Sequence, residues 1–260
     1  LPTDGRPFHL HGSPPCQQFS NGNSTGRTAE GHAAASDMVE WYIKRALESR
    51  ASSWSMEQVS TNGVVKIVER IRKRHPKKLA YHVFSLEQLG VPQTRKRLIA
   101  GTPALVARLV RLCGNHRVRS VRDVISTGRA THLRNSIGWD VKTLRHIRKP
   151  GQTKYMYERR PLVPESDSVR SVTLPAPTLL CNGDMRWAWW DTDGVVRLQH
   201  VRVSHAAALQ TFPSSYAWPK KVKQAYKQIG NALPPLVAEL LLRGERGHPR
   251  SLEYPLVSLE

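Results

Sequence analysis

A cysteine follows two consecutive prolines near the start of the chain, in the segment Gly12-Ser13-Pro14-Pro15-Cys16-Gln17. Each proline fixes its own φ, and Pro15 also pushes Pro14 toward extended backbone, so a stiff turn sets the position of the thiol. A thiol held in place before any ligand arrives is what a covalent nucleophile requires. The alternative is a structural cysteine buried at the end of a strand, which is the more common use of this residue.

Three more segments carry residues that could do chemistry. Glu57 stands in Glu57-Gln58-Val59, and the alternative for it is an ordinary carboxylate at a strand end. Arg95 and Arg97 lie two residues apart, so their side chains leave an extended segment on the same side, and a solvated basic face is the alternative. The last segment is a pair of motifs, Leu209-Gln210-Thr211-Phe212-Pro213 and Gln228-Ile229-Gly230-Asn231-Ala232-Leu233-Pro234-Pro235.

In this order the four segments resemble the motifs of the cytosine-5 DNA methyltransferases, and the match runs from the first residues to about Ala238. The resemblance implies an α/β fold, a partial Rossmann-like methyltransferase sheet with an inserted small, irregular target-recognition module. It also implies the activity of a DNA (cytosine-5-)-methyltransferase with S-adenosylmethionine as the methyl donor. Because a thiol cannot reach a cytosine ring inside a duplex, this activity requires base flipping.

The resemblance assigns catalytic roles to four residues. Cys16 is the nucleophile, and its thiolate adds to carbon 6 of cytosine so that carbon 5 can attack a methyl donor. Glu57 binds the ring at nitrogen 3 and at the exocyclic amine, which stabilises the charge arriving from sulfur. Arg95 and Arg97 hold the flipped base and the loop of the nucleophile.

Four other residues are expected to bind ligands. By the same resemblance, Pro15 and Asn231 contact the methyl donor, and Gln17 and Ser20 contact the DNA backbone. The glycine-rich segment 21–31 is suited to close over a flipped base, and a surface loop without a role is the alternative.

The composition points to a polyanionic partner. The chain carries 40 Lys and Arg residues against 20 Asp and Glu residues, for a formal net charge of +20 in 260 residues. Such a surface usually faces nucleic acid, so double-stranded DNA is the expected partner, and a solvated surface without a partner is the alternative. Acidic membrane lipid is disfavoured because the charged helices lack a clean apolar face. RNA stays open as a substrate, because phosphate contacts dominate the binding of both nucleic acids.

The cysteines are scattered at Cys16, Cys113 and Cys181, without paired spacing. This argues against a disulfide framework and a Cys-rich zinc site, and it fits a reducing, intracellular compartment such as the cytoplasm or nucleus. We expect His9 and His11 to point to opposite faces of a strand and to bind no metal. No apolar run has membrane-spanning length, and no signal peptide is visible.

Strands and helices are expected to alternate up to residue 102, which implies a mainly parallel sheet. The expected strands are 53–59, 79–84 and 97–101, and the expected helices are 37–50, 64–74, 105–112, about 198–210 and 236–242.

The expected domain division is a catalytic α/β part at 1–102, a target-recognition-like insert at 103–195, a C-terminal return to the catalytic domain at 196–245 and a poorly ordered tail at 246–260. Short strands are expected in the insert. Its tryptophans are expected to contact bases or to form a small core, and they are Trp139, Trp187, Trp189 and Trp190.

The chain departs from the family's pattern in three ways. Gln58 replaces the usual asparagine after the glutamate, which is expected to loosen the strand end. Ser204-His205 replaces an Arg-Glu pair, which affects domain packing more than chemistry. The family's glycine-rich donor-binding turn and acidic donor ligands lie upstream of the Pro-Pro-Cys motif, where this chain begins at Leu1.

These departures predict a fragment or one part of a split enzyme, in which an upstream segment or a second chain supplies the donor-binding half. One alternative is a catalytically incomplete, basic DNA-binding subunit or remnant. Another is an RNA cytosine-5 methyltransferase. The presence of the nucleophile and the other three catalytic residues favours the enzyme, because a binding role alone does not need a thiol.

Overall fold

The chain forms two compact units in a computed structural model that describes residues 6–19, 28–126, 155–158, 168–181, 185–190, 196–243 and 257–258. Unit 1 comprises Leu1–Leu89, Lys96–His116 and Ala238–His248. Unit 2 comprises Gly90–Arg95, Arg117–Val237 and Pro249–Glu260. The domain boundaries expected near residues 102, 195 and 245 stay predictions.

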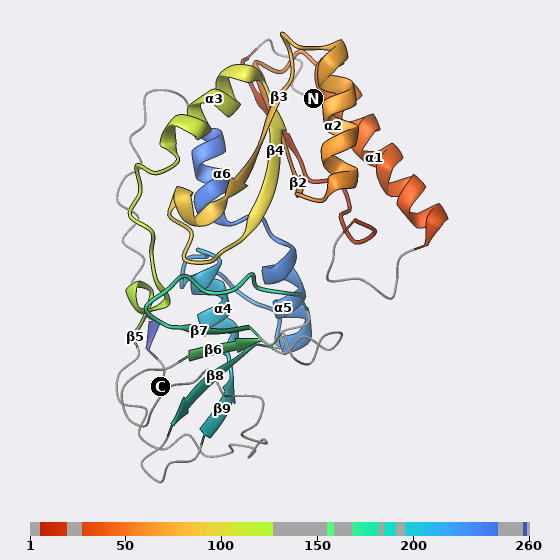
Figure 1. The fold of residues 1–260 in the computed structure, drawn as a ribbon. Coiled ribbons are helices and arrows are strands. Elements are labelled where there is room, and N and C mark those ends of the chain that lie inside the picture. Colours follow the sequence, from red (N-terminus) through yellow and green to blue (C-terminus); the bar gives the residue numbers. More distant parts are fainter. Residues whose placement is uncertain are drawn as a thin grey trace. The chain divides into compact units, whose positions relative to one another are not determined.

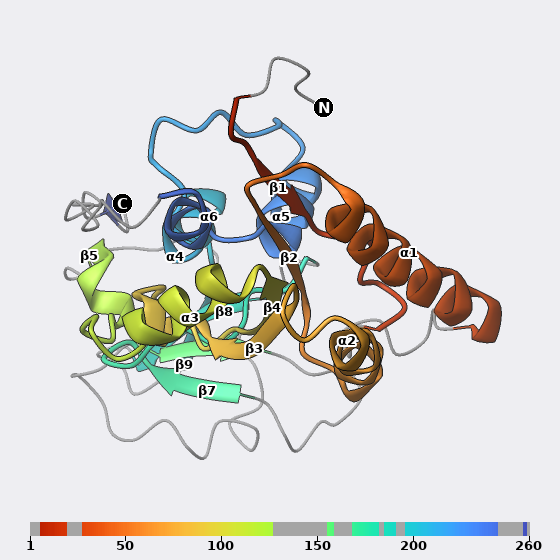
Figure 2. The ribbon, with the colours of Figure 1, turned by 90° about the horizontal axis from the view of Figure 1, so that it is seen from above.

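Unit 1 is built on a four-stranded sheet with the order β1-β2-β4-β3 (Figures 1 and 2). The strands are β1 (His9–Gly12), β2 (Ser53–Val59), β3 (Ala80–Ser85) and β4 (Lys96–Gly101). β1 and β2 run parallel, whereas β4 runs antiparallel to both β2 and β3, so the expectation of a mainly parallel sheet was wrong here. β3 and β4 are joined only by residues 86–95, which include the 3-10 helix η2 (Leu86–Leu89), and a parallel crossover needs a dozen residues or more.

Helices cover both faces of this sheet (Figure 2). α1 (Ala29–Glu48) and α2 (Asn62–Arg74) pack together on one face, and α3 (Pro103–Leu112) lies on the other. Apolar residues repeat at helical spacing on the buried sides of α1 and α2, because each helix must bury one stripe against the sheet. The core that they form with β2 and β4 includes Val39, Ile43, Met56, Val64, Val68 and Leu98.

α1 begins at Ala29, well before the predicted start at residue 37. The Thr28 side chain caps the helix by accepting a hydrogen bond from the backbone N–H of Gly31 at 3.0 Å. The alanines at 33–35 then extend the helix, whereas the sequence predicted a loop up to residue 31. The predicted strands and the other predicted helices of unit 1 are confirmed, with ends that differ by two residues at most.

Gly12, the last residue of β1, allows α1 to approach the sheet closely. A Cβ at this position would lie 2.1 Å from Cε2 of Tyr42 on α1, so a larger residue does not fit. The Tyr42 hydroxyl donates to the carbonyl of Ser55 at 2.8 Å, and burial raises the pKa of Tyr42. This contact fixes α1 against the strand ends from which the Pro-Pro-Cys turn leaves.

Unit 2 contains a four-stranded antiparallel sheet with the order β7-β6-β8-β9 (Figure 1). The strands are β6 (Tyr155–Glu158), β7 (Ser168–Ser171), β8 (Met185–Trp190) and β9 (Val196–His200). β5 (Ile125–Ser126), which follows the 3-10 helix η3 (Val121–Asp123), pairs in parallel with β10 (Val257–Ser258). The predicted short strands are confirmed. Of the predicted tail, only β10 lies within the described residues.

Two helices of unit 2, α4 (Val203–Leu209) and α5 (Val222–Asn231), pack with this sheet around one core. The expected helix from about residue 198 was wrong in its first part, because Leu198 pairs with Ala188 on β8. α5 was not expected. Trp187 is buried in the core, while Trp139 and the side chains of Trp189 and Trp190 lie outside the described residues.

Residue 205 shows how the fold accommodates one departure from the family's pattern. His205 on α4 is buried, and its Nδ1 accepts a hydrogen bond from Nε1 of Trp187 at 3.3 Å. The two rings meet edge to face with centroids 5.7 Å apart. The pair therefore joins α4 to β8.

Thr211 follows α4 with a positive φ of 66°, which is costly for a β-branched residue. Its Oγ1 accepts a hydrogen bond at 3.1 Å from the backbone N–H of Leu236, in the first turn of α6 (Pro235–Leu242). This bond satisfies a backbone donor that the helix itself leaves without an acceptor, and so offsets part of the strain.

Candidate active site

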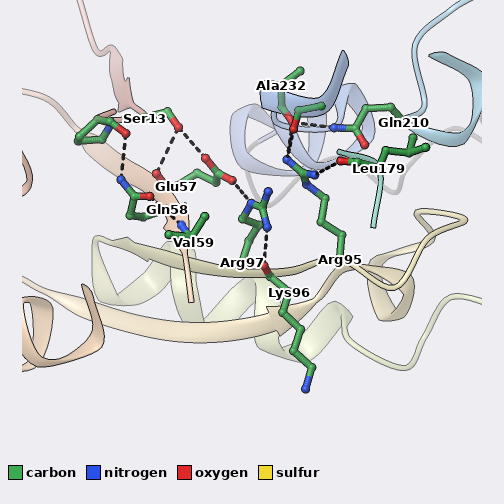
Figure 3. A network of polar contacts seen from close by, with 12 residues as sticks. Ser13, Glu57, Gln58, Val59, Arg95, Lys96, Arg97, Leu179, Gln210 and Ala232 are labelled. Carbon is green, nitrogen blue, oxygen red and sulfur yellow. Dashed lines mark hydrogen bonds and ion pairs between the residues drawn. The ribbon is translucent and has the colours of Figure 1, made fainter. Parts of the chain in front are cut away.

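The carboxylate of Glu57 is the centre of a polar cluster in unit 1 (Figure 3). Ser13, directly after β1, donates from Oγ to Oε2 of Glu57 at 2.6 Å. Arg97 on β4 forms an ion pair from Nε to Oε1 at 2.7 Å. The side chains of Glu57 and Arg97 are only 7% and 13% exposed, so solvent screens this pair weakly. Because β2 lies between β1 and β4, groups from both neighbours reach one carboxylate.

Gln58 ties the Pro-Pro-Cys turn to β2. It is buried, and its Nε2 donates to the carbonyl of Pro14 at 2.9 Å, while its Oε1 accepts from the backbone N–H of Val59 at 2.8 Å. The sequence had led us to expect a loosened strand end at this substitution. The amide instead satisfies backbone groups on both segments, and so holds the turn beside Glu57.

Cys16 lies in the turn that follows β1, and its side chain is half-buried. The backbone N–H of Phe19 donates to the carbonyl of Cys16 at 3.0 Å, and the Phe19 ring is buried in the core of unit 1. Pro15 and Gln17, on either side of the thiol, are exposed. The predicted DNA contact Ser20 and residues 21–27 lie outside the described residues.

His9 and His11 lie on the same face of β1, because residues i and i+2 of a strand share a face. The expectation of opposite faces was wrong. The two ring nitrogens of His9 bond Oγ of Ser53 and of Ser55 at 2.7 and 2.8 Å, and Nδ1 of His11 bonds Oγ of Ser55 at 2.8 Å. Burial lowers the pKa of both histidines, and the charge of Glu57 opposes this for His11. The described part of the chain holds no cluster of three or more metal-ligating side chains.

Arg95 makes its hydrogen bonds within unit 2 (Figure 3). Its side chain is buried, and Nη2 donates to the carbonyls of Gly230 at 2.8 Å and Ala232 at 3.3 Å. Nη1 donates to the carbonyl of Leu179 at 3.4 Å. The guanidinium therefore binds the backbone on both sides of Asn231, the predicted donor contact.

Two buried glutamines in unit 2 support the same backbone, and the sequence assigned no role to either. Gln93 donates from Nε2 to the carbonyl of Leu209 at 3.1 Å and to Oε1 of Gln210, and its Oε1 accepts from the N–H of Leu179 at 3.1 Å. Gln210 donates to the carbonyl of Ala232 at 2.7 Å. The sequence carried one indication of a role, because both glutamines stand within motifs shared with the cytosine-5 DNA methyltransferases.

Asn231 is exposed at the C-terminal end of α5. Gly230 and Asn231 end α5, and α6 begins only at Pro235. A Cβ on Gly230 would lie 2.5 Å from the backbone nitrogen of Cys181, so only glycine fits there. The close packing of Gly230 and the hydrogen bonds from Arg95 thus fix the backbone position of Asn231.

Residues 124–244 match the sequence family described as C-5 cytosine-specific DNA methylase. The match places a C-5 cytosine-specific DNA methylase domain within residues 124–244 of the chain. The range that matches includes Asn231, whereas Cys16, Glu57, Arg95 and Arg97 precede it. No curated protein sequence matches the chain.

Solved methyltransferases are similar in fold to this chain. The S. pombe Dnmt2 methyltransferase aligns over 90% of this chain and 75% of its own, with a TM-score of 0.50 and 14% identity. The Entamoeba histolytica methyltransferase EhMeth aligns over 90% and 76%, with a TM-score of 0.51 and 13% identity. An E. coli prophage protein described as a DNA modification methyltransferase aligns over 90% and 77%, with a TM-score of 0.53 and 15% identity. These likenesses confirm the predicted α/β, Rossmann-like methyltransferase fold.

None of the helices in the described ranges is both long and apolar enough to cross a membrane.

Proposed function

We propose that this chain transfers a methyl group to carbon 5 of a flipped cytosine in double-stranded DNA, through a covalent adduct with Cys16. The observation that carries this proposal is the position of Glu57. Ser13, three residues before the thiol, and Arg97, from the Gln-Thr-Arg-Lys-Arg segment, both bond its carboxylate. Three segments that are far apart in the sequence thus meet at a group able to bind a cytosine ring.

Cys16 is the proposed nucleophile. Its thiolate adds to carbon 6 of cytosine, forming an Sγ–C6 bond and moving electron density onto carbon 5, which then attacks the methyl donor. The methyl–sulfur bond of the donor would break as the methyl group is transferred. Water then takes the proton from the methylated carbon 5, the Sγ–C6 bond breaks and the thiolate leaves. The two prolines and the Gln58–Pro14 bond hold the thiol's turn while this happens.

Glu57 is the proposed binding group for nitrogen 3 and the exocyclic amine of the base. Arg97 holds Oε1 and Ser13 holds Oε2, which fixes the plane of the carboxylate before a base arrives. A carboxylate oxygen accepts more than one hydrogen bond, so Oε2 can receive the cytosine amine as well as the Ser13 hydroxyl. The carboxyl group would supply a proton to nitrogen 3, which stabilises the negative charge that arrives in the ring from sulfur.

We propose that Arg95 acts as a positioning residue within unit 2. Its bonds to carbonyls beside Asn231 fix the backbone from which the donor contact projects. We propose that Gln17 and Ser20, next to the thiol in sequence, contact the DNA backbone.

S-adenosylmethionine is the proposed donor, and it supplies the methyl group when bound. Pro15 and Asn231 would hold it, since both side chains are exposed and the amide of Asn231 can donate and accept hydrogen bonds. We further propose that a segment upstream of Leu1, or a second chain, supplies the rest of this donor site. β1 is an edge strand of its sheet, and the outer side of an edge strand can pair with an added strand.

The test is covalent trapping on a DNA duplex that contains 5-fluorocytosine, with S-adenosylmethionine and with the coding sequence upstream of Leu1 included. An adduct that resists denaturation is expected, and Cys16→Ser should abolish it. Cys181→Ser, which removes an exposed thiol elsewhere, should trap at the wild-type rate. An adduct that persists in Cys16→Ser contradicts the proposed nucleophile. An adduct with RNA but none with DNA contradicts the proposed substrate.

A further inference from the structure

The outer face of α2 carries a cluster of cations. Lys66, Arg70, Lys73 and Arg74 are exposed and are spaced by three or four residues, so they share the face opposite the buried Val64 and Val68. Two more exposed lysines, Lys77 and Lys78, follow the helix after His75 and Pro76. These six residues are called the α2 basic face.

Most of these cations form no ion pair with a carboxylate of the described residues. Arg70 pairs with Glu40 on α1. In the described ranges, no carboxylate forms an ion pair with any of the other five residues of the α2 basic face. Like charges at these helical spacings destabilise a helix by a few tenths of a kcal/mol per pair. The face therefore carries a repulsion that a bound polyanion would relieve.

The helix dipole accounts for only part of this arrangement. Cations in the last turn, here Lys73 and Arg74, are favoured by the partial negative charge of the helix C-terminus. That effect falls off within one turn, so it does not explain Lys66 near the start of α2. It also does not explain Lys77 and Lys78, which lie beyond the end of the helix.

The shape and chemistry of the face fit a phosphate backbone. Val65, Lys66, Glu69, Arg70, Lys73 and Arg74 line a depression along α2. Lys66 and Arg74 lie about 12 Å apart along the helix axis, at about 1.5 Å per residue, and a DNA duplex carries about seven charges over that length. No large hydrophobic residue of α2 is exposed, whereas a helix that inserts into a lipid surface needs an apolar face.

We propose that the α2 basic face binds the phosphate backbone of duplex nucleic acid without reading its sequence, as a contact additional to the base-binding site. The Glu57 carboxylate, in the same unit, bonds Ser13 and Arg97, which are not part of this face. The inference rests on charge and exposure and does not depend on the proposed methyl transfer.

The test compares two variants of the full chain that lose the same charge. The first is K66Q/K73Q/K77Q/K78Q on the α2 basic face. The control is K220Q/K221Q/K223Q/K227Q, which also removes four exposed lysines without a carboxylate partner in the described residues. Binding of a fluorescent duplex of arbitrary sequence is measured from 50 to 300 mM salt, after thermal melting shows that both variants fold.

We expect the α2 variant to bind at least tenfold more weakly at the lowest salt. The slope of its log affinity against log salt concentration should become less negative by about 0.9 for each phosphate that the variant no longer neutralises. The control should stay within about twofold of wild type, and K66R/K73R/K77R/K78R should bind like wild type. Equal losses in the α2 variant and the control, or a loss in neither, overturn the proposal. So does an α2 variant that loses binding to phosphatidylserine vesicles while it retains DNA binding. A negative trapping result with 5-fluorocytosine leaves this outcome unaffected.

Discussion

The hydroxyl of Ser13 donates to Oε2 of Glu57 at 2.6 Å, which joins the Pro-Pro-Cys turn to the buried carboxylate on β2. Arg97 occupies the other oxygen of the same carboxylate, at 2.7 Å. The turn that carries the proposed nucleophile and the proposed base-binding group are thus connected through one hydrogen bond. This connection gives Ser13 a positioning role that its sequence position alone does not reveal.

Ser13→Ala should slow covalent trapping of 5-fluorocytosine DNA about tenfold. A hydrogen bond to a charged group contributes about 1.5–3 kcal/mol, and about 1.4 kcal/mol corresponds to tenfold in rate. Quench-flow or gel measurement of adduct formation gives the rate. Ser214→Ala, an exposed serine of unit 2, is the control and should trap normally. Normal trapping by Ser13→Ala shows that the bond has no role in the reaction.

Arg97→Met should lower the free energy of unfolding by about 3 kcal/mol, because it leaves the Glu57 carboxylate buried without its ion-pair partner. The double variant E57Q/R97M should lose less than the sum of the two single variants, since no charge is then left uncompensated. Urea unfolding of the four proteins measures this coupling. Strictly additive losses mean that the ion pair contributes nothing to the fold.

Arg95→Lys should destabilise the chain by about 2–4 kcal/mol although it keeps the charge. The planar guanidinium bonds three carbonyls at once, and an ammonium on a lysine stem does not reproduce that fork. Arg202→Lys, at an exposed position, should change the stability by less than about 0.5 kcal/mol. If urea unfolding gives the two variants equal stability, the carbonyl contacts of Arg95 carry no net energy.

Acidification should destabilise unit 1 through His9 and His11. Burial lowers the pKa of both in the folded chain below the ordinary 6.5, so the unfolded chain binds more protons at mildly acidic pH. The stabilisation is therefore fully present above pH 6.5 and is lost as the pH falls toward the lowered values. Urea unfolding at pH 7.5 and 5.5 should show a smaller decrease for H9Q/H11Q than for wild type. An unchanged decrease assigns the pH effect to other groups.

The local pattern was sufficient for most elements of unit 1. The apolar residues Val65, Ile67, Val68 and Ile71 predicted α2, and the apolar and aromatic residues of 53–59 predicted β2. The start of α1 was missed because it depends on a cap at Thr28 within a segment whose glycines favour a loop. The direction of β4 was missed because it follows from the length of its connection to β3 rather than from its residues.

For the candidate site, too, the sequence determined some features and the tertiary structure decided others. The sequence by itself determined which residue types were present for chemistry: a thiol after two prolines at Cys16, a carboxylate at Glu57, and guanidinium groups at Arg95 and Arg97. These could be read because each stands in a short motif with a local geometry of its own.

Only the tertiary structure decided which of these groups meet. It paired Arg97 with Glu57 in unit 1, and it bound Arg95 to carbonyls of unit 2 from a position two residues away. The physical reason is that a hydrogen bond between distant segments depends on strand order and packing, which bring together residues that the local pattern does not connect. Local patterns therefore identified the chemical groups, and the packing of the chain assigned their partners.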